Sequence, residues 1–210
     1  MSPRPYRPGQ RQAAAEQTRA KILEAACELL TGDKGPAAFS MDAVARTAGV
    51  ARMTVYYQFE SKTGLMEALF DDLAVRGGMG RIPEAFMRPV STEALSELIQ
   101  VLVGFYSSGR IALRRLRGLA IMDPELETAL QSRGERRRGG LGVILGRLVA
   151  DRGAEITARE LEELSELLFM LTSFETFDAL AGPQGDAQAV CDQVEELIMA
   201  VLERRLRSRA

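Results

Sequence analysis

The chain has 210 residues, of which 46% are hydrophobic and 27% charged, the balance of a globular protein with one large domain or two small ones. It contains no histidine, which removes Ser–His and Cys–His nucleophiles and imidazole metal ligands, so an enzyme is the less favoured class. The net charge of −2 divides unevenly, because residues 1–62 carry +3 and residues 63–210 carry −5. A basic N-terminal segment followed by an acidic remainder is typical of a phosphate-binding module joined to another domain. A basic tail without a phosphate-binding role would give the same charge distribution.

The sequence also bears on compartment and cofactors. No apolar run approaches the roughly 20 residues that span a bilayer, and the N-terminus lacks the apolar segment of a signal peptide. Cys27 and Cys191 stand far apart, in neither a disulfide nor a zinc spacing. We therefore expect a cytoplasmic protein with no metal and no cofactor.

The first predicted element is an amphipathic helix. Residues 1–14 show no periodicity and are interpreted as a flexible basic arm. From Thr18, a plausible N-cap, the pattern becomes helical and ends near Gly32. One face of this helix carries apolar residues at the helical spacing, namely Ile22, Ala25, Ala26, Leu29 and Leu30.

Two short helices and a longer one are predicted between residues 40 and 78. Ser40 is the candidate cap of a short helix, which Gly49 ends. A second short helix is predicted from Ala51 to Phe59, and Ser61 is expected to cap a longer one that ends at Gly77. A capped helix, a glycine turn and a second helix are the parts of a helix-turn-helix motif.

The second helix of this motif presents side chains suited to DNA. Val50 and Val55 are predicted to anchor it, and Phe59 is interpreted as a core residue. The other face is then available to enter a major groove, which is wide enough for an α-helix. Arg and Gln can bind base edges or phosphates, Met can touch a thymine methyl group, and hydroxyl groups and a helix-terminal Lys can bind phosphate. The predicted DNA-binding residues are Ser40, Arg52, Met53, Thr54, Tyr56, Tyr57, Gln58 and Lys62.

The remainder is also predicted to be helical. Apolar residues repeat at helical spacing over 95–106, 111–122, 161–180 and 187–206. Residues 125–151 fit a helix as well, but five glycines interrupt them and leave the boundaries undefined. No alternating β pattern and no internal repeat is present, so the predicted fold class is all-α.

Residues 18–69 resemble the DNA-binding domain of the TetR (tetracycline-repressor-like) family of transcription regulators. The resemblance lies in the apolar face of the first helix, in S-M-D-A-V-A-R-T-A-G-V, and in T-V-Y-Y-Q-F-E-S-K-T-G-L. Its most specific part is the spacing of Thr54, Tyr56, Phe59, Lys62 and Leu65. Arg52-Met53 departs from the small or Lys-Gly pair common in the family, which suggests an unusual operator.

The resemblance implies a ligand-responsive regulator, most often a repressor, that binds a palindromic operator as a homodimer and is released by a small molecule. It implies a helix-turn-helix domain over 15–62, a connecting helix over 63–78, and a larger ligand-binding and dimerisation domain over 79–210. The helices near 161–180 and 187–206 would form the dimer interface, although their apolar stripes equally fit the core of a monomer.

An effector pocket is expected to be apolar, with a few polar groups. Aromatic and Met residues at helical spacing are also typical of ordinary core, so the candidates share that alternative. Arg114, Arg115, Arg117 and the run Arg136 to Arg138 are interpreted as solvated faces. The pocket candidates are Phe105, Tyr106, Met122, Phe169, Met170, Ser173, Phe174 and Phe177, with polarity from Arg110, Ser173, Glu175 or Asp178.

A helical adaptor and an all-α enzyme are the two other functional classes. A helical adaptor of the same fold, without specific operator binding, is the alternative, and Tyr57, Lys62 and the basic arm favour the regulator over it. An all-α enzyme would need a carboxylate cluster with histidine, and the sequence has no histidine.

Overall fold

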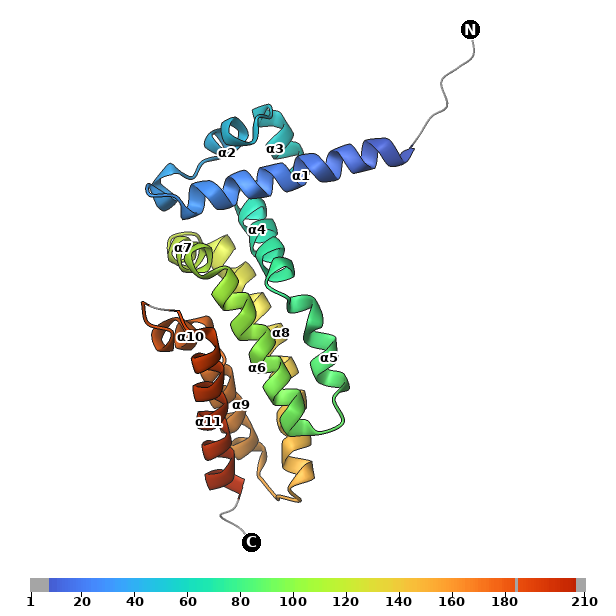
Figure 1. Cartoon of the computed structure of the whole chain (residues 1–210), viewed down its shortest axis with the longest axis vertical. Helices are drawn as coiled ribbons and strands as arrows, with labels where there is room; N and C mark the ends of the chain where they lie inside the picture. Colours follow the sequence, from blue (N-terminus) through green and yellow to red (C-terminus); the bar gives the residue numbers. More distant parts are fainter. Residues whose placement is uncertain (1–7, 184, 207–210) are drawn as a thin grey trace. The chain divides into compact units, whose positions relative to one another are not determined.

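The computed structural model describes residues 8–183 and 185–206. Within these residues every regular element is helical, which confirms the all-α fold class. The chain forms two compact units (Figure 1), and each is described by itself. Unit 1 comprises residues 1–72 and 111–127, and unit 2 comprises residues 73–110 and 128–210.

Unit 1 is built on the first helix. It contains α1 (Pro8–Thr31), η1 (Gly35–Ala38), α2 (Met41–Ala48), α3 (Arg52–Phe59), most of α4 (Lys62–Arg76), α7 (Arg110–Ala120) after its first residue, and the first turn of α8 (Pro124–Asp151). α2 packs against both α1 and α3. The core of the unit consists of fully buried side chains from these helices, among them Ile22, Ala26, Leu30, Val44, Val55, Leu65 and Leu69.

The first helix begins earlier than predicted. It starts at Pro8, and Thr18 is not its N-cap, because the Thr18 hydroxyl donates to the carbonyl oxygen of Ala14 at 2.8 Å. Proline is tolerated in the first turn of a helix, and the run of three alanines at 13–15 has high helix propensity. The predicted arm therefore overlaps a helix from residue 8 onward, while Arg4 and Arg7 lie outside the described residues.

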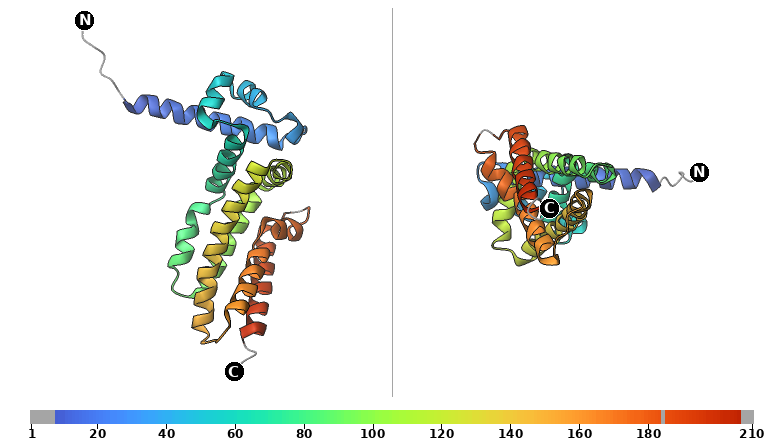
Figure 2. Two further views of the ribbon diagram at one scale, coloured as in Figure 1. Left: turned by 180° about the vertical axis from the view of Figure 1, so that it is seen from behind. Right: turned by 90° about the horizontal axis from the view of Figure 1, so that it is seen from below.

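Unit 2 surrounds one buried helix. It contains η2 (Met79–Arg81), α5 (Ile82–Met87), α6 (Ser91–Ser108), most of α8, α9 (Ala158–Leu171), α10 (Phe174–Leu180) and α11 (Ala187–Leu206). α5, α10 and α11 all contact α6, and α11 also contacts α9, so that α11 lies beside α6 and α9 in two opposite views (Figures 1 and 2). Because neighbours cover α6 on several sides, most of its side chains are buried, including Leu95, Ile99 and Leu102.

The short elements η2 and α5 were not predicted, and ion pairs explain how they are held. The Glu97 carboxylate on α6 is 8% exposed as a residue and pairs with Arg81 and, at 2.9 Å, with Arg88. Arg147 of α8 donates to the carbonyl oxygen of Phe86 at 3.2 Å. Long-range partners of this kind leave no periodic signal in a six-residue segment.

α8 runs unbroken through its glycines. Its inward face carries fully buried Leu141, Ile144, Leu145 and Leu148. Each interior glycine costs about 1 kcal/mol relative to alanine, and burial of four large side chains outweighs that cost at about 1.5–3 kcal/mol each. Tertiary packing therefore determines that α8 is one continuous helix, where intrinsic helix propensity left its boundaries undefined.

The predicted helix over 161–180 is two helices. α9 ends at Leu171, and the Ser173 hydroxyl accepts a hydrogen bond from the Thr176 backbone N–H at 3.1 Å as the N-cap of α10. The apolar periodicity continues across the break, which is why one helix was expected. The signal for two was the capping residue Ser173 itself.

Candidate nucleic-acid interface and effector cavity

The turn of the helix-turn-helix motif is formed as predicted. The Ser40 hydroxyl accepts from the backbone N–H of Ala43 at 3.1 Å and caps α2. Gly49 ends α2 with φ at 66°, in the left-handed region, and Val50 N–H donates back to the Ala45 carbonyl oxygen at 3.0 Å. Residues other than glycine are strained in this conformation, so Gly49 sets the angle at which α3 leaves the turn.

α3 turns one face inward and the other outward. Val55 and Phe59 are buried, which confirms Phe59 as a core residue. Met53 and Tyr57 are 73% and 87% exposed, large values for apolar or aromatic side chains. Of the other predicted DNA-binding residues, Arg52, Lys62 and Ser40 are exposed, whereas Thr54, Tyr56 and Gln58 are partly exposed.

The C-terminal end of α3 is held by α1. The Arg19 guanidinium lies 4.5 Å from the centroid of the Phe59 ring and donates to the Gln58 carbonyl oxygen at 3.3 Å. A cation at a helix C-terminus satisfies otherwise unpaired carbonyls. Arg19 contributed to the basic charge of the N-terminal segment, and its contacts show that it also holds the C-terminal end of α3.

The link from α3 to α4 is tight. Glu60 has φ at 64°, and the Ser61 hydroxyl accepts from the Gly64 backbone N–H at 2.9 Å, as the predicted cap. A Cβ on Gly64 would lie 2.3 Å from the Phe59 carbonyl oxygen, so only glycine fits. Lys62 follows in the first turn of α4, with its ammonium 5.9 Å from the centroid of the buried Phe39 ring. A cation therefore lies at a helix N-terminus, beside α3.

Arg52 has two partners that the sequence analysis missed. Its Nε atom lies 2.9 Å from Oδ1 of Asp42 in α2, and its Nη2 donates to the Tyr56 hydroxyl at 3.3 Å. The hydrogen bond with Tyr56, together with the charge of Asp42, raises the pKa of Arg52 above its ordinary value. The available signal was spacing, because Asp42 and Arg52 both occupy the first turn of adjacent helices.

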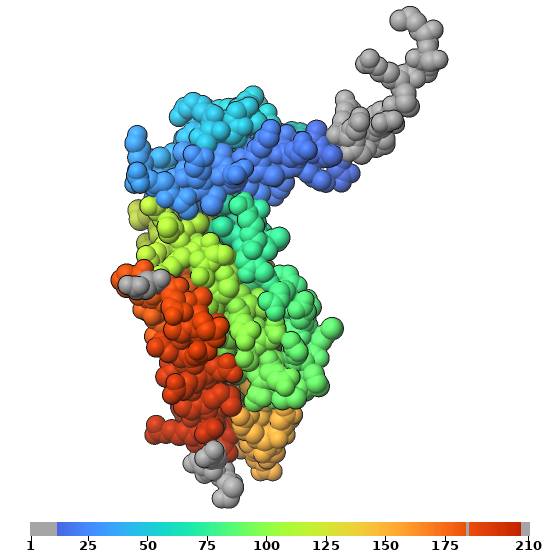
Figure 3. Space-filling view, in the orientation of Figure 1, coloured from blue at the N-terminus to red at the C-terminus, as the bar shows by residue number. Residues whose placement is uncertain are grey.

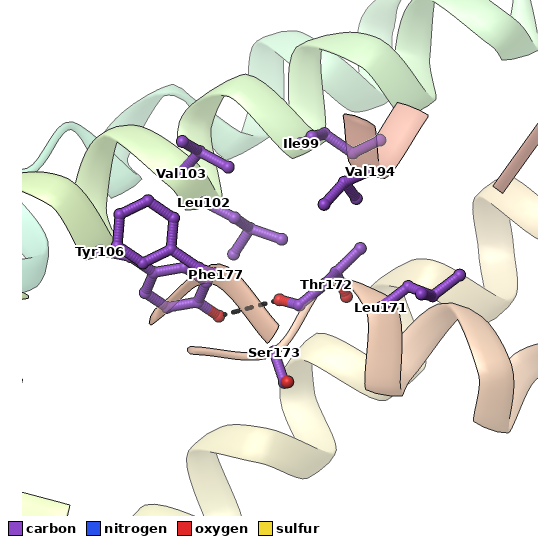
Figure 4. A pocket seen from close by; sticks show the side chains of 9 residues that line it. All are labelled: Ile99, Leu102, Val103, Tyr106, Leu171, Thr172, Ser173, Phe177 and Val194. Atoms are coloured by element: carbon purple, nitrogen blue, oxygen red, sulfur yellow. Dashed lines mark hydrogen bonds between the residues drawn. The ribbon is translucent and has the colours of Figure 1, made fainter. Parts of the chain in front are cut away.

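Unit 2 contains a small apolar cavity (Figure 4). Its space is about 10 Å³, room for about one water molecule. The Tyr106 hydroxyl donates to the Thr172 carbonyl oxygen at 3.1 Å at the break between α9 and α10. The lining residues come from α6, from this break, from α10 and from α11, and are Ile99, Leu102, Val103, Tyr106, Leu171, Thr172, Ser173, Phe177 and Val194.

The predicted pocket residues separate into three groups. Tyr106, Ser173 and Phe177 line the cavity. Phe105 and Phe174 are buried beside it, with ring centroids 5.3 and 5.6 Å from that of Tyr106. The structure does not place the others in the cavity.

These remaining candidates lie on surfaces. Met122 belongs to unit 1, in the turn between α7 and α8, and is 85% exposed, and Met170 of α9 is 53% exposed. Phe169 contacts Arg137 and Arg138, whose guanidinium carbons each lie 4.0 Å from its ring centroid. The aliphatic lining was missed, since those side chains fit an ordinary helical core equally well.

The charged candidates are engaged elsewhere. Arg110 and Asp178 form an ion pair of 2.6 Å that is mostly buried, while Glu175 is exposed.

Arg137 donates to the Thr172 hydroxyl at 2.6 Å, and Arg115 donates to the Gly32 carbonyl oxygen at 2.6 Å. The interpretation of Arg115 and Arg137 as solvated faces was therefore wrong.

The part of the chain that the structure describes offers neither a metal site nor a membrane span. Within it, no three or more Cys, Asp or Glu side chains are grouped so as to hold a metal ion, and no helix has the length and apolar character to cross a membrane. Burial raises the pKa of the Cys191 thiol to about 11, aided by nearby Asp192 and Glu195, so this thiol is protonated and unreactive at neutral pH.

Comparisons with known proteins agree with this geometry. The sequence model described as "Bacterial regulatory proteins, tetR family" matches residues 22–69. A comparison with curated proteins finds no match.

Solved structures similar to this chain show the same fold. A TetR-like transcriptional regulator from Rhodococcus sp. RHA1 has a TM-score of 0.66 and 22% identity, covering 95% of this chain and 98% of that one. FadR from Bacillus subtilis in complex with stearoyl-CoA has a TM-score of 0.68 and 18% identity, covering 85% and 96%. GusR from Salmonella enterica has a TM-score of 0.67 and 17% identity, covering 89% and 96%.

The sequence match covers the helices that form the turn and the exposed α3 face, and the structural likeness extends over most of the chain. Residues 22–69 therefore match the tetR family of bacterial regulatory proteins, and the chain as a whole has the fold of solved TetR-family transcriptional regulators.

Proposed function

We propose that this protein is a ligand-responsive transcriptional repressor that binds a palindromic operator as a homodimer in the cytoplasm and is released by a small molecule. The observation that carries the proposal is the outer face of α3. Met53 and Tyr57 are more than 70% exposed there, while Val55 and Phe59 hold the helix from behind. Large exposed side chains on an anchored helix are suited to a partner surface, and the match to the tetR family of bacterial regulatory proteins supports DNA as that partner.

The side chains of the interface divide into two roles. Arg52, Met53 and Gln58 are assigned to base edges in the major groove. Tyr57 and Lys62 are assigned to phosphate oxygens, with Ser40, Thr54 and Tyr56 beside them. Lys62 is suited to a phosphate because it joins an ammonium to the backbone N–H groups of the first turn of α4.

The N-terminal arm is assigned to additional DNA contacts. Arg4, Arg7 and Arg11 add three positive charges ahead of the helix-turn-helix motif. Each phosphate contact releases counterions and steepens the salt dependence of binding. Deletion of residues 2–12 is therefore expected to lower affinity and flatten that dependence.

The homodimer is assigned to α9 and α11. Val190, Val194, Ile198 and Leu202 of α11 are buried within the chain, so the inner part of the predicted stripe is the protomer's own core. Two large apolar side chains stay exposed among polar ones on the outer side, Leu197 at 45% and Leu161 of α9 at 38%. The surface of α11 is open along its length in the space-filling view (Figure 3). Apolar residues that protrude from two packed helices support a self-complementary contact.

The effector site is assigned to the cavity of unit 2. Its lining is almost wholly apolar, with Tyr106, Thr172 and Ser173 as its polar members. A space of about 10 Å³ is far below the roughly 300 Å³ of a typical ligand site, so an effector must separate α10 from α6. The B. subtilis FadR structure contains stearoyl-CoA, and a hydrophobic acyl-type effector is consistent with the lining here.

The test replaces the two residues assigned to phosphates. Tyr57→Ala with Lys62→Ala is expected to abolish most specific DNA binding and to leave the helical circular dichroism spectrum unchanged, because both side chains are exposed. The control is Met87→Ala with Arg159→Ala, which removes one exposed apolar group and one exposed cation from unit 2. Normal operator binding by the first variant would contradict the assignment and favour the adaptor alternative.

A further inference from the structure

Arg52 is tied to two side chains at the start of the recognition helix. Its Nη1 donates to Oδ2 of Asp42 at 3.4 Å, its Nε lies 2.9 Å from Oδ1, and its Nη2 donates to the Tyr56 hydroxyl at 3.3 Å. Its guanidinium carbon also lies 5.4 Å from the centroid of the Tyr56 ring. One group from α2 and one from α3 thus restrict a side chain that would otherwise sample many rotamers.

Stability does not account for this arrangement. The Arg52 and Asp42 side chains are 60% and 49% exposed, and an exposed ion pair adds little to folding stability. The main consequence of the ion pair is to fix the direction in which the Arg52 guanidinium points. A guanidinium carries five N–H donors in a rigid plane, so the contacts of Nε, Nη1 and Nη2 leave two N–H groups for a third partner.

The charge of Asp42 indicates what that third partner is. A phosphate placed beside Arg52 would also be placed near the Asp42 carboxylate, and the two anions would repel each other. A base edge carries no net charge and does not meet that repulsion. Guanine offers O6 and N7 as a pair of acceptors that matches the planar fork of arginine.

We propose that Asp42 is a positioning residue for base readout: it holds the Arg52 guanidinium so that its remaining N–H groups bind guanine in the major groove of each half-site. The inference rests on the proposed operator binding and adds the base that is read and the residue that orients the reader. Asp42 is well placed for this role, because a carboxylate in the first turn of α2 is itself stabilised by the helix dipole.

The experiment first selects preferred duplexes from a randomised DNA library with the full-length protein. Fluorescence anisotropy then measures affinity for the selected duplex and for each of its single-base-pair variants. Arg52→Ala is expected to lose preference for one guanine per half-site by about tenfold. Asp42→Ala is expected to lose preference at that same base pair, and Asp42→Asn, which keeps an acceptor oxygen without the charge, to lose less.

Two comparisons separate positioning from a plain change of charge. Asp33→Ala removes an exposed carboxylate from the same unit and is expected to leave every base preference unchanged. Adding Asp42→Ala to Arg52→Ala is expected to cause no further loss of preference, since the residue being positioned is already absent.

Three outcomes would overturn the inference. Asp42→Ala with wild-type preference at every base pair, or with a uniform gain in affinity, would show that the carboxylate only adds negative charge. A selected site without guanine at the affected position would show that the base is misassigned. A wild-type protein that enriches no sequence would overturn operator binding itself, and with it this inference, whereas the first two outcomes leave operator binding intact.

Discussion

Glu60 has a backbone conformation that side chains other than glycine rarely adopt. Its φ is 64° and its ψ is −49°, and the Ser61 N–H donates to the Phe59 carbonyl oxygen at 2.6 Å, which closes a γ-turn. Such strain costs on the order of 1–3 kcal/mol. The turn joins α3 to α4, so the strain lies directly between the recognition helix and Lys62.

Relief of this strain is expected to stabilise unit 1. Glu60→Gly should raise the free energy of unfolding by about 1 kcal/mol, because relief of strain exceeds the roughly 0.5–1 kcal/mol that glycine costs in the unfolded chain. Gly49→Ala is the opposite case and should lower it by about 1 kcal/mol. Urea unfolding measures both. A Glu60→Gly protein less stable than wild type would show that the turn is not strained.

Single residues also show how far the sequence predicted the site. Ser40, Gly49 and Ser61 were placed correctly because capping and left-handed turns depend on local chemistry. The contact of Arg19 with Phe59 was not predicted, since it joins residues 40 positions apart and leaves no periodic signal. The pair formed by Asp42 and Arg52 was also missed, although both residues occupy the first turn of adjacent helices.

Among the elements, α7 is tied to the end of α1. The Arg115 guanidinium donates to the carbonyl oxygen of Leu30 in the last turn of α1 and to that of Gly32, which also accepts from the Gly35 backbone N–H at 2.9 Å. It lies against Gly35, where a Cβ would come within 3.1 Å of its guanidinium carbon. One side chain of α7 therefore caps the helix on which the DNA-binding motif is built.

Removal of this cap is expected to destabilise unit 1. Arg115→Ala should lower the free energy of unfolding by about 2 kcal/mol, since it leaves carbonyls without a charged donor. Arg115→Lys should cost less, because an ammonium keeps the charge without the planar fork. Thermal unfolding followed by circular dichroism compares the two. An unchanged midpoint for Arg115→Ala would mean that solvent satisfies these carbonyls equally well.

The helices were predicted correctly where a single apolar face packs on a single core. The prediction failed where the chain bends between two helices. The helices α2, α3, α4, α6 and α11 were all expected near their observed limits. The break at Thr172 and Ser173 was missed because buried residues continue at helical spacing on both sides of it. Two lining residues of the cavity, Leu171 and Thr172, were missed with it, because the break brings them to α6 beside the predicted Ser173.

At the scale of the whole molecule, the proposed binding to a palindromic operator requires two copies of the chain. Two recognition helices must lie about 34–36 Å apart, or a multiple of that distance, to read successive half-sites. The surface proposed for that pairing is the outer side of α9 and α11, where Leu161 and Leu197 are exposed. Half-site spacing and oligomeric state are thus linked consequences of one interface.

A charge placed on this surface is expected to separate the copies. Leu197→Arg should convert a dimer into a monomer of 23.0 kDa, because it puts a guanidinium into an apolar contact, and operator affinity should fall with it. Gln188→Arg, on the opposite side of α11 at 100° per residue, is the control. Sedimentation velocity gives the masses. A Leu197→Arg protein that remains dimeric would place the interface elsewhere.

The most direct test of the central claim is a fluorescence anisotropy titration of the full-length protein against duplexes from the DNA flanking its own gene. An unrelated duplex of equal length serves as the control, and each titration is repeated at several salt concentrations. A regulator is expected to prefer one duplex by about a thousandfold or more, and to keep that preference as salt rises. Equal, weak binding to every duplex that disappears together with added salt would indicate phosphate attraction alone and would contradict operator recognition.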